Sequence, residues 1–211
     1  MAQTPSPFRT AEQRSRDRQA KKLALMEAAV RMFNTRGFHA TSLDDVAASL
    51  GVTKPTVYHY LGNKENVLLE CLRFGLKQLL DAATHARAQT GVAADRLRSF
   101  LIVYTQVNMS DFGRCVIRTP DEALSEESRE VLRGLKRQIH AEMRSLIAEG
   151  QADGSIACED ANLLAFTLAG ALNWPARWYD ESRGHSPEET AMRLVDNLAA
   201  GFLPRSRPSN P

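Results

Sequence analysis

Hydrophobic residues return at intervals of three and four along most of this 211-residue sequence, and this repeat constrains the fold more than any other feature. Met26, Ala29, Val30 and Phe33 show it first, and comparable stripes follow as far as Phe202. Such spacing places side chains on one face of an α-helix. The alternating apolar runs between hairpin turns that mark β-strands are not found. The sequence therefore predicts an all-α fold of about nine helices.

Glycine, proline and capping residues mark the expected helix ends. Ser42 with Asp45, and Thr53 ahead of Pro55, have the composition of helix N-termini. Pro175 should bend the eighth helix, because it lacks a backbone N–H and clashes with the preceding turn. The expected helices cover a stretch that includes 26–33 and ends at Arg36, then 43–50, 54–60, 64–87, 97–107, 112–117, 131 to the closing glycines Gly150 and Gly154, 160 to beyond 175, and 187–202.

The net charge of +2 conceals an uneven distribution along the chain. Ten Lys and Arg stand against five acids between Met1 and Lys64, so the remainder of the chain is net acidic. A basic segment that neutralises phosphates releases counterions, which gives non-specific affinity for nucleic acid. The same charges would also suit an ordinary solvated surface.

A more specific motif lies within the basic segment. Two short helices are expected on either side of Ser49–Thr53, where Gly51 permits a tight turn, and this spacing is that of a helix-turn-helix. The second helix would expose donors, acceptors and flat rings suited to base edges in the major groove, on Lys54, Thr56, Tyr58, His59 and Tyr60. The helix N-termini at Thr41, Ser42 and Thr53 suit phosphates, and Lys64 could reach the DNA backbone beyond the groove. A helix-turn-helix used only for packing is the alternative.

Residues 37–47, GFHATSLDDVA, and 52–65, VTKPTVYHYLGNKE, resemble the signature of the TetR family of repressors, and the likeness extends over about 20–70. The resemblance implies a nine-helix protomer, a homodimer built on the last two long helices, and a palindromic double-stranded DNA operator. By the family's pattern, phosphates would be held by Thr41, Thr53, Tyr60 and Lys64, and bases would lie nearest Lys54, Thr56, Tyr58 and His59. Tyr60 stands where many members have phenylalanine, which leaves the role of its hydroxyl open.

Six aromatic residues of the C-terminal part lie on three expected helices. A helical interior lined by them can form an effector pocket, although aromatic stripes are more often plain core. The residues concerned are Phe100, Tyr104, Phe112, Phe166, Trp174 and Trp178.

The segment 170–179, GALNWPARWY, resembles a stretch found in TetR relatives that sense acyl-CoA thioesters. Arg177 beside Trp174 and Trp178 could hold a phosphate or carboxylate while the indoles stack on a flat ring, and Asn173 belongs to the same segment. The same cluster could instead anchor a dimer interface, where these residue types are enriched. A ligand bound across the interface would satisfy both interpretations.

These observations favour a ligand-responsive transcriptional regulator over two rivals: an enzyme and an architectural DNA-binding protein without an effector. Enzyme motifs such as GxSxG, HExxH, the P-loop and GxGxxG are not found, and no cofactor is expected. Cys71, Cys115 and Cys158 show neither a disulfide framework nor a zinc motif, so no metal site is expected. Without a secretory signal or membrane-spanning run, the sequence predicts a cytoplasmic protein that does not enter a membrane.

The expected organisation is therefore a disordered arm over 1–15, a helix-turn-helix DNA-binding domain over 16–62, a ligand-binding and dimerisation domain over 63–203, and a flexible tail over 204–211. The effector is expected to be an acyl-CoA or a fatty or aromatic acid. Its binding would shift the population towards a form whose recognition helices no longer match one DNA turn.

Overall fold

The computed structural model describes residues 10–200, and every regular element in that range is helical. The first four helices are α1 (Ala11–Arg36), α2 (Leu43–Ser49), α3 (Lys54–Leu61) and α4 (Lys64–Arg87). The others are α5 (Ala93–Met109), α6 (Asp111–Arg118), α7 (Glu126–Asp153), α8 (Ala161–Asn173), α9 (Pro175–Trp178) and α10 (Pro187–Ala200). Two 3-10 turns, η1 (Asp121–Ala123) and η2 (Glu181–Arg183), lie before α7 and α10. Apart from the four-residue α9, the described helices match the expected nine, and the all-α prediction is confirmed.

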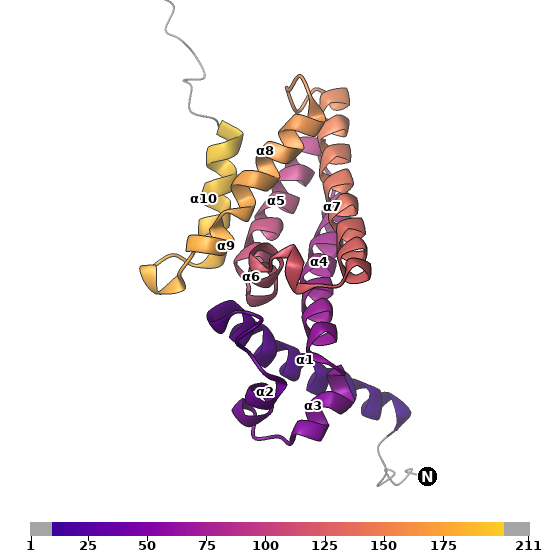
Figure 1. The fold of residues 1–211 in the computed structure, drawn as a ribbon. Coiled ribbons are helices and arrows are strands. Elements are labelled where there is room, and N and C mark those ends of the chain that lie inside the picture. The colour runs from indigo at the N-terminus through magenta and orange to yellow at the C-terminus, as the bar shows by residue number, and fades with distance from the viewer. Residues whose placement is uncertain (1–9, 201–211) are drawn as a thin grey trace, which may run out of the picture.

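The helices form two parts joined by α4. Helices α1 to α3 lie at the lower end of the molecule in Figure 1, and α4 rises from them into the bundle of α5 to α10. One cluster of buried apolar residues extends through both parts, from Val30 and Val57 to Phe100, Leu146 and Leu172. The part of the chain that the structure describes includes no helix long and apolar enough to cross a membrane.

Helix α1 begins earlier than the sequence predicted. Thr10 and Gln13 form a capping box, in which the Gln13 N–H donates to Thr10 Oγ1 at 3.1 Å and the Thr10 N–H donates to Gln13 Oε1 at 2.9 Å. These bonds satisfy two N–H groups that a helix end otherwise leaves unpaired. Residues 11–15 are therefore helical, which corrects the expected arm of 1–15. Residues 1–9 and the expected tail lie outside the described residues.

Two other predicted helix ends can be compared with the structure. Helix α7 ends at Asp153, with Gly154 at its C-cap in the left-handed region at φ 76°, so it closes at the second of the two expected glycines. The first, Gly150, lies within α7, where a Cβ would be 2.4 Å from Ile156 Cδ1. Pro175 does not bend a continuous helix. Helix α8 stops at Asn173 and α9 starts at Pro175, at the point where the proline lacks its N–H.

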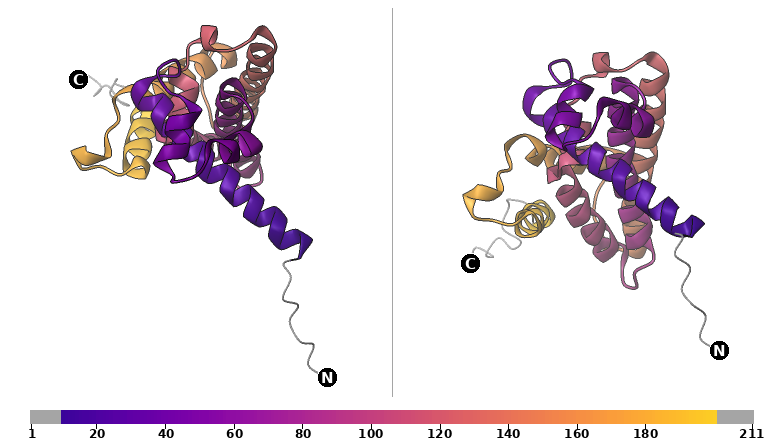
Figure 2. Two further views of the ribbon diagram at one scale, coloured as in Figure 1. Left: turned by 60° about the horizontal axis from the view of Figure 1, so that its bottom comes forward. Right: turned by 90° about the horizontal axis from the view of Figure 1, so that it is seen from below.

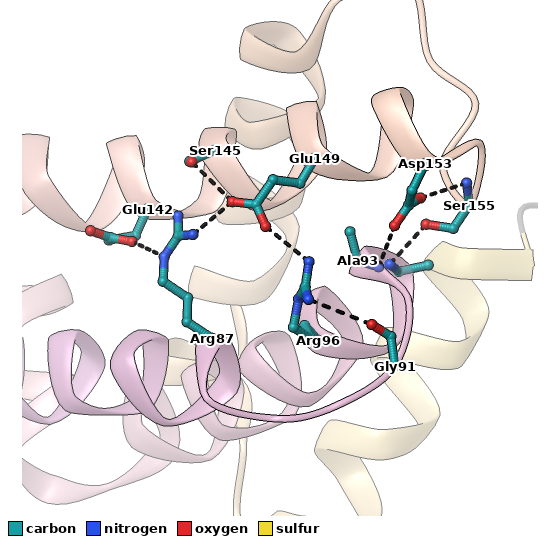
Figure 3. A network of polar contacts seen from close by, with 10 residues as sticks. Arg87, Gly91, Ala93, Arg96, Glu142, Ser145, Glu149, Asp153 and Ser155 are labelled. Atoms are coloured by element: carbon teal, nitrogen blue, oxygen red, sulfur yellow. Dashed lines mark hydrogen bonds and ion pairs between the residues drawn. The ribbon is translucent and has the colours of Figure 1, made fainter.

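A polar network ties the far end of α4 to α5 and α7 (Figure 3). Arg87, the last residue of α4, donates from Nε to Glu142 at 2.6 Å and from Nη1 to Glu149 at 2.6 Å. Arg96 of α5 donates to the second oxygen of Glu149 at 2.9 Å. One carboxylate on α7 therefore links the two helices that the loop after α4 connects.

Candidate functional site

Helices α2 and α3 are held in place by a cap at the start of α2 and by two buried valines. The Asp45 N–H donates to Ser42 Oγ at 3.1 Å, and the Ser42 N–H donates to Asp45 Oδ2 at 3.1 Å. Hydrogen bonds from Ser42 hold the pKa of Asp45 below its ordinary value. Val46 and Val57 are fully buried and pack α2 and α3 into the N-terminal core. The opposite face of α3 is therefore left on the surface.

Several side chains expected to lie near DNA bases are on that outer face. Tyr58 is 44% exposed, and Lys54 and His59 are also exposed. Lys54 Nζ donates to Asp44 Oδ2 at 2.9 Å, and this hydrogen bond raises the pKa of Lys54. The free protein thus carries a protonated lysine beside an exposed aromatic ring, 5.7 Å from the ring centre of Tyr58.

The residues expected to bind phosphates differ from one another in exposure and in their contacts. Thr53 is exposed at the N-cap of α3 and makes no cap bond, since its hydroxyl lies 2.9 Å from that of half-buried Thr56. Lys64 donates to the His39 carbonyl at 3.1 Å and lies over the Phe38 ring. Tyr60 is half-buried against the core, beside His59.

Thr41 lies inside the protein rather than on its surface. The residue is 2% exposed and its hydroxyl donates to the Gly37 carbonyl at 2.9 Å. Ser42, next in the chain, is exposed. The structure therefore brings the outward-facing members of the expected set together around α3 and leaves the Thr41 hydroxyl engaged within the fold.

A second feature is a cavity of about 880 Å³ in the helical bundle. It lies among α4, α5, α6, α7 and α8, and three of the expected effector-binding residues line it: Tyr104, Phe166 and Asn173. Most of the wall is apolar, with Leu76, Leu79, Ile139 and Met143 among its members. Lys136, Arg137 and His140 of α7 add polar and cationic groups to one side.

The cavity wall includes a cluster of polar side chains, and some of their hydrogen-bonding atoms have no partner within residues 10–200. Asn173 Oδ1 accepts from the Tyr104 hydroxyl at 2.7 Å and from Asn108 Nδ2 at 2.9 Å. Burial raises the pKa of Tyr104, which keeps its hydroxyl protonated. Asn108 is 1% exposed and its Oδ1 has no hydrogen-bond partner among the described residues, and the same is true of His140 Nε2. Buried polar atoms in this state are uncommon and favour a bound partner such as water or a ligand.

The other expected effector residues lie elsewhere. Phe100 is fully buried, and Phe112 packs its ring 4.6 Å from that of Phe74, so both belong to the core and not to the cavity wall. Arg177 and Trp178 line a separate hollow of about 730 Å³ beside Arg114. Trp174 lines neither space and is 61% exposed.

Sequence reasoning missed Asn108, Lys136, His140 and Met143, which all line the cavity. A signal existed for two of them: Asn108 is a polar residue on the apolar stripe of α5, and His140 is next to buried Ile139 on α7. The His140 ring lies 4.2 Å from that of Phe166. Only the packing of α7 against α8 reveals this contact.

A strip of exposed apolar side chains runs along α8. Leu163, Phe166 and Trp174 follow one another at spacings of three and eight residues, and they are 64%, 59% and 61% exposed. Met192 and Leu198 of α10 are 37% and 36% exposed. Phe166 belongs both to this strip and to the cavity wall, so the cavity lies directly beneath the exposed face.

Residues 10–200 contain no group of three or more His, Cys, Asp or Glu arranged to hold a metal ion. Cys71 and Cys115 are buried, and burial raises the pKa of Cys115 to about 11. At neutral pH both thiols are protonated and serve as small apolar groups in the core.

Comparisons with known proteins agree with this architecture. Residues 25–71 match the family described as "Bacterial regulatory proteins, tetR family", and residues 90–202 match "Tetracyclin repressor-like, C-terminal domain". The HTH-type transcriptional regulator EthR of Mycolicibacterium smegmatis is 30% identical over 95% of this chain and 94% of its own. The crystal structure of the TetR family regulator PfmR from Thermus thermophilus is 26% identical, with a TM-score of 0.78 over 85% of this chain and 99% of its own.

A further similar structure is AibR in complex with isovaleryl coenzyme A and operator DNA, which is 20% identical and shares the fold with a TM-score of 0.73 over 85% of this chain and 96% of its own. Members of the matched family are DNA-binding transcriptional regulators and not enzymes. From its helix-turn-helix, its helical C-terminal part and these matches over most of its length, the chain belongs to the TetR family.

Proposed function

We propose that this protein is a homodimeric repressor that holds a palindromic operator and releases it when a small amphipathic effector enters the bundle. The observation that carries the proposal is the outer face of α3, where Lys54, Tyr58 and His59 are exposed beside one another while Val57 anchors the helix from behind. Side chains of these types can hydrogen-bond and stack on base edges in the major groove. Thr53 and Lys64 flank them and suit phosphates.

The apolar strip on α8, together with α10, is the proposed dimer interface. Exposed apolar side chains that lie together raise the free energy of a free protomer in water, so burying them favours association. A two-fold pair would present two copies of α3, and a palindromic operator with half-sites one helical turn apart mirrors that symmetry. Trp174 and Trp178 then belong to this interface or its edge, because they are exposed and lie outside the cavity.

The effector is proposed to bind in the 880 Å³ cavity with its apolar part against Phe166, Met143 and Leu79. Lys136 forms no ion pair within residues 10–200 and lines the same cavity, which suits a carboxylate or an acyl thioester rather than a pure hydrocarbon. AibR, which shares the fold, was solved with isovaleryl coenzyme A. A fatty or aromatic acid and its CoA thioester are therefore the two candidate forms of the effector.

A physical route joins the cavity to the DNA-binding helices. Helix α6 contributes Val116 and Ile117 to the cavity wall, and at its start the Asp111 carbonyl accepts a hydrogen bond from Asn34 of α1 at 2.8 Å. Helix α4 contributes Leu76 and Leu79 to the same wall and continues into the DNA-binding part. A hundredfold loss of operator affinity needs only about 2.7 kcal/mol of differential binding between the two forms.

The proposal is tested first on DNA. Wild-type protein is used to enrich binding sequences from a random duplex library, and we expect a palindrome with half-sites about one turn apart. His59→Ala and Tyr58→Ala should relax sequence preference, with a loss of about 1–3 kcal/mol at the bases they contact. Failure of the wild type to enrich any sequence would exclude the repressor proposal.

The effector is tested separately with the same protein. A thermal-shift screen compares fatty acids, aromatic acids and their CoA thioesters, and each hit is tested for release of the enriched operator. Phe166→Ala should weaken binding of the hit, whereas Val92→Ala, at a 47% exposed residue outside the cavity, should not. A protein that binds operator but is released by none of these classes would favour the alternative, an architectural DNA-binding protein.

A further inference from the structure

The first half of α1 is a helix with no buried side chain. Residues 11–24 are all exposed or half-buried over about 21 Å of helix at 1.5 Å per residue, and the N-terminal end of this stretch projects from the rest of the molecule (Figure 2). Lys22 Nζ donates to Glu70 at 2.5 Å where α1 meets α4. Helices in proteins draw most of their stability from packing an apolar face. A projecting polar helix of this length therefore suggests a surface that meets a partner.

The charge on this stretch indicates the chemistry of that partner. Residues 11–22 carry five Lys and Arg and two acids. Arg14, Arg18 and Lys21 are spaced by four and three residues, so they lie within about 60° of one another around the helix. All three are exposed, and none of the three side chains forms a hydrogen bond or ion pair within residues 10–200. We call these three residues the α1 basic row.

Arg16 provides a contrast on the same helix. It points to the opposite side from the α1 basic row and donates to Glu12 at 2.6 Å. The row itself lies in line with Leu25, eleven residues after Arg14, which is buried in the N-terminal core. The three cations without a carboxylate partner in the described part of the chain thus occupy one face of the helix, and paired Arg16 lies away from it.

The α1 basic row is also close to the proposed DNA interface. Helix α1 contacts α3, and the N-terminal end of α1 lies on the same lower side of the molecule as α2 and α3 (Figure 1). A duplex held against α3 would extend beyond the groove that α3 enters. The N-terminal end of α1 lies on the side of the molecule away from α10 (Figure 1), so with α8 and α10 as the proposed dimer interface it would face the outer flank of the operator and not its centre.

We propose that Arg14, Arg18 and Lys21 form a second DNA-binding site, which holds backbone phosphates of the duplex that flanks the operator core. This inference rests on the proposed function, because α3 must first hold the duplex in place. From Arg14 to Lys21 the helix advances by about 10 Å, which is the length of about three base pairs. Three cations over this distance match a run of phosphates on one strand.

The site would add affinity without adding sequence preference. Contacts to phosphates position a protein and strengthen its binding, but they carry no direct information on the bases. Each neutralised phosphate also steepens the salt dependence, with a slope of about −0.9 per contact in a plot of log K against log salt concentration. The number of phosphates that the row contacts in each protomer can therefore be derived from the change in this slope.

The experiment measures binding of the full-length protein to two duplexes that contain the operator enriched by the wild type. One duplex ends at the operator core and the other extends about ten base pairs, roughly one helical turn, further on each side. For the long duplex, R14Q/R18Q/K21Q should reduce affinity by at least about tenfold at about 0.15 M salt and lower the salt slope by about 0.9 for each lost contact. For the short duplex, the variant and the wild type should bind alike, and the ranking of operator sequences should not change.

The matched control is R16Q/K77Q/R133Q, which removes three exposed cations that already have carboxylate partners. It changes the net charge by the same amount and should leave the salt slope on the long duplex near that of the wild type. Equal effects of the two triple variants, or an unchanged slope in R14Q/R18Q/K21Q, would overturn the proposal while leaving the repressor function intact. Loss of binding to phosphatidylglycerol vesicles with unchanged duplex affinity would assign the row to a membrane surface instead.

Discussion

At the scale of single residues, the described glycine with the least room for a side chain is Gly113 in α6. A Cβ at this position would lie 1.9 Å from the Val107 carbonyl oxygen and 2.6 Å from the carbonyl carbon. Backbone atoms cannot move aside as the end of a side chain can. The absence of a side chain at Gly113 therefore lets α6 turn back directly against the end of α5.

We expect Gly113→Ala to destabilise the protein by about 3 kcal/mol, because overpacking against backbone forces α5 and α6 apart. Gly134→Ala is the control. It lies within α7, where the nearest atom to an added Cβ is 3.9 Å away, and alanine should stabilise that helix by about 0.5–1 kcal/mol. Urea unfolding followed by circular dichroism measures both. Equal stability of the two variants would contradict the close approach at Gly113.

At the scale of elements, Glu149 on α7 links α4 and α5 through ion pairs with Arg87 and Arg96 (Figure 3). Its hydrogen bond from Arg87 holds the pKa of Glu149 below its ordinary value. The ion pairs therefore stabilise the fold above the pKa of the unfolded carboxyl, about 4.3, and this stabilisation is lost as the pH falls through the lower pKa of the folded state.

Glu149→Gln should lower stability at pH 7 by only about 1 kcal/mol, since the side chain is 38% exposed and water weakens the pairs. The loss should be smaller at about pH 3 than at pH 7, because pH 3 lies below the ordinary carboxyl pKa of about 4.3 and nearer to the lowered pKa of the folded state. Urea midpoints at the two pH values measure this. Glu159→Gln, at an exposed carboxylate in the loop before α8, should leave the midpoint at pH 7 unchanged. A pH-independent effect of Glu149→Gln would argue against the ion pairs as its cause.

The contact between α1 and α6 belongs to the same scale. Asn34 provides the hydrogen bond to the Asp111 carbonyl that spans the two parts of the molecule. Asn34→Ala should leave effector affinity of the free protein near that of the wild type but reduce the effector-induced loss of operator affinity by about fivefold, or about 1 kcal/mol of coupling. Titration calorimetry and operator release measure the two quantities. An unchanged release would place the coupling in α4 alone.

At the scale of the whole molecule, the exposed strip on α8 should determine the oligomeric state. Trp174→Glu places a charge in the proposed interface and should shift the protein to monomers at micromolar concentration, with operator affinity falling by at least about tenfold because only one recognition helix remains on each particle. Sedimentation velocity and operator titration measure these effects. Val92→Glu changes a 47% exposed apolar residue away from the strip and should remain dimeric. A dimeric Trp174→Glu protein would place the interface elsewhere.

The sequence alone determined the helices and the helix-turn-helix, because apolar periodicity, capping residues and glycine turns act within a few residues of one another. Ser42 with Asp45 predicted the start of α2, and the face of α3 opposite Val57 was predicted to be exposed. Thr10 with Gln13 is a cap of the same local kind, and the first five residues of α1 lie within the expected arm of 1–15.

Only the tertiary structure decided which aromatic residues face a cavity and which fill the core. Phe100 and Tyr104 lie one turn apart on α5, yet only Tyr104 lines the cavity. Likewise, Asn108, His140 and Asn173 come from three helices that are distant in sequence. Their meeting depends on how α5, α7 and α8 cross, and crossing angles are set by the packing of whole helix surfaces, which the helical repeat of any single segment does not specify.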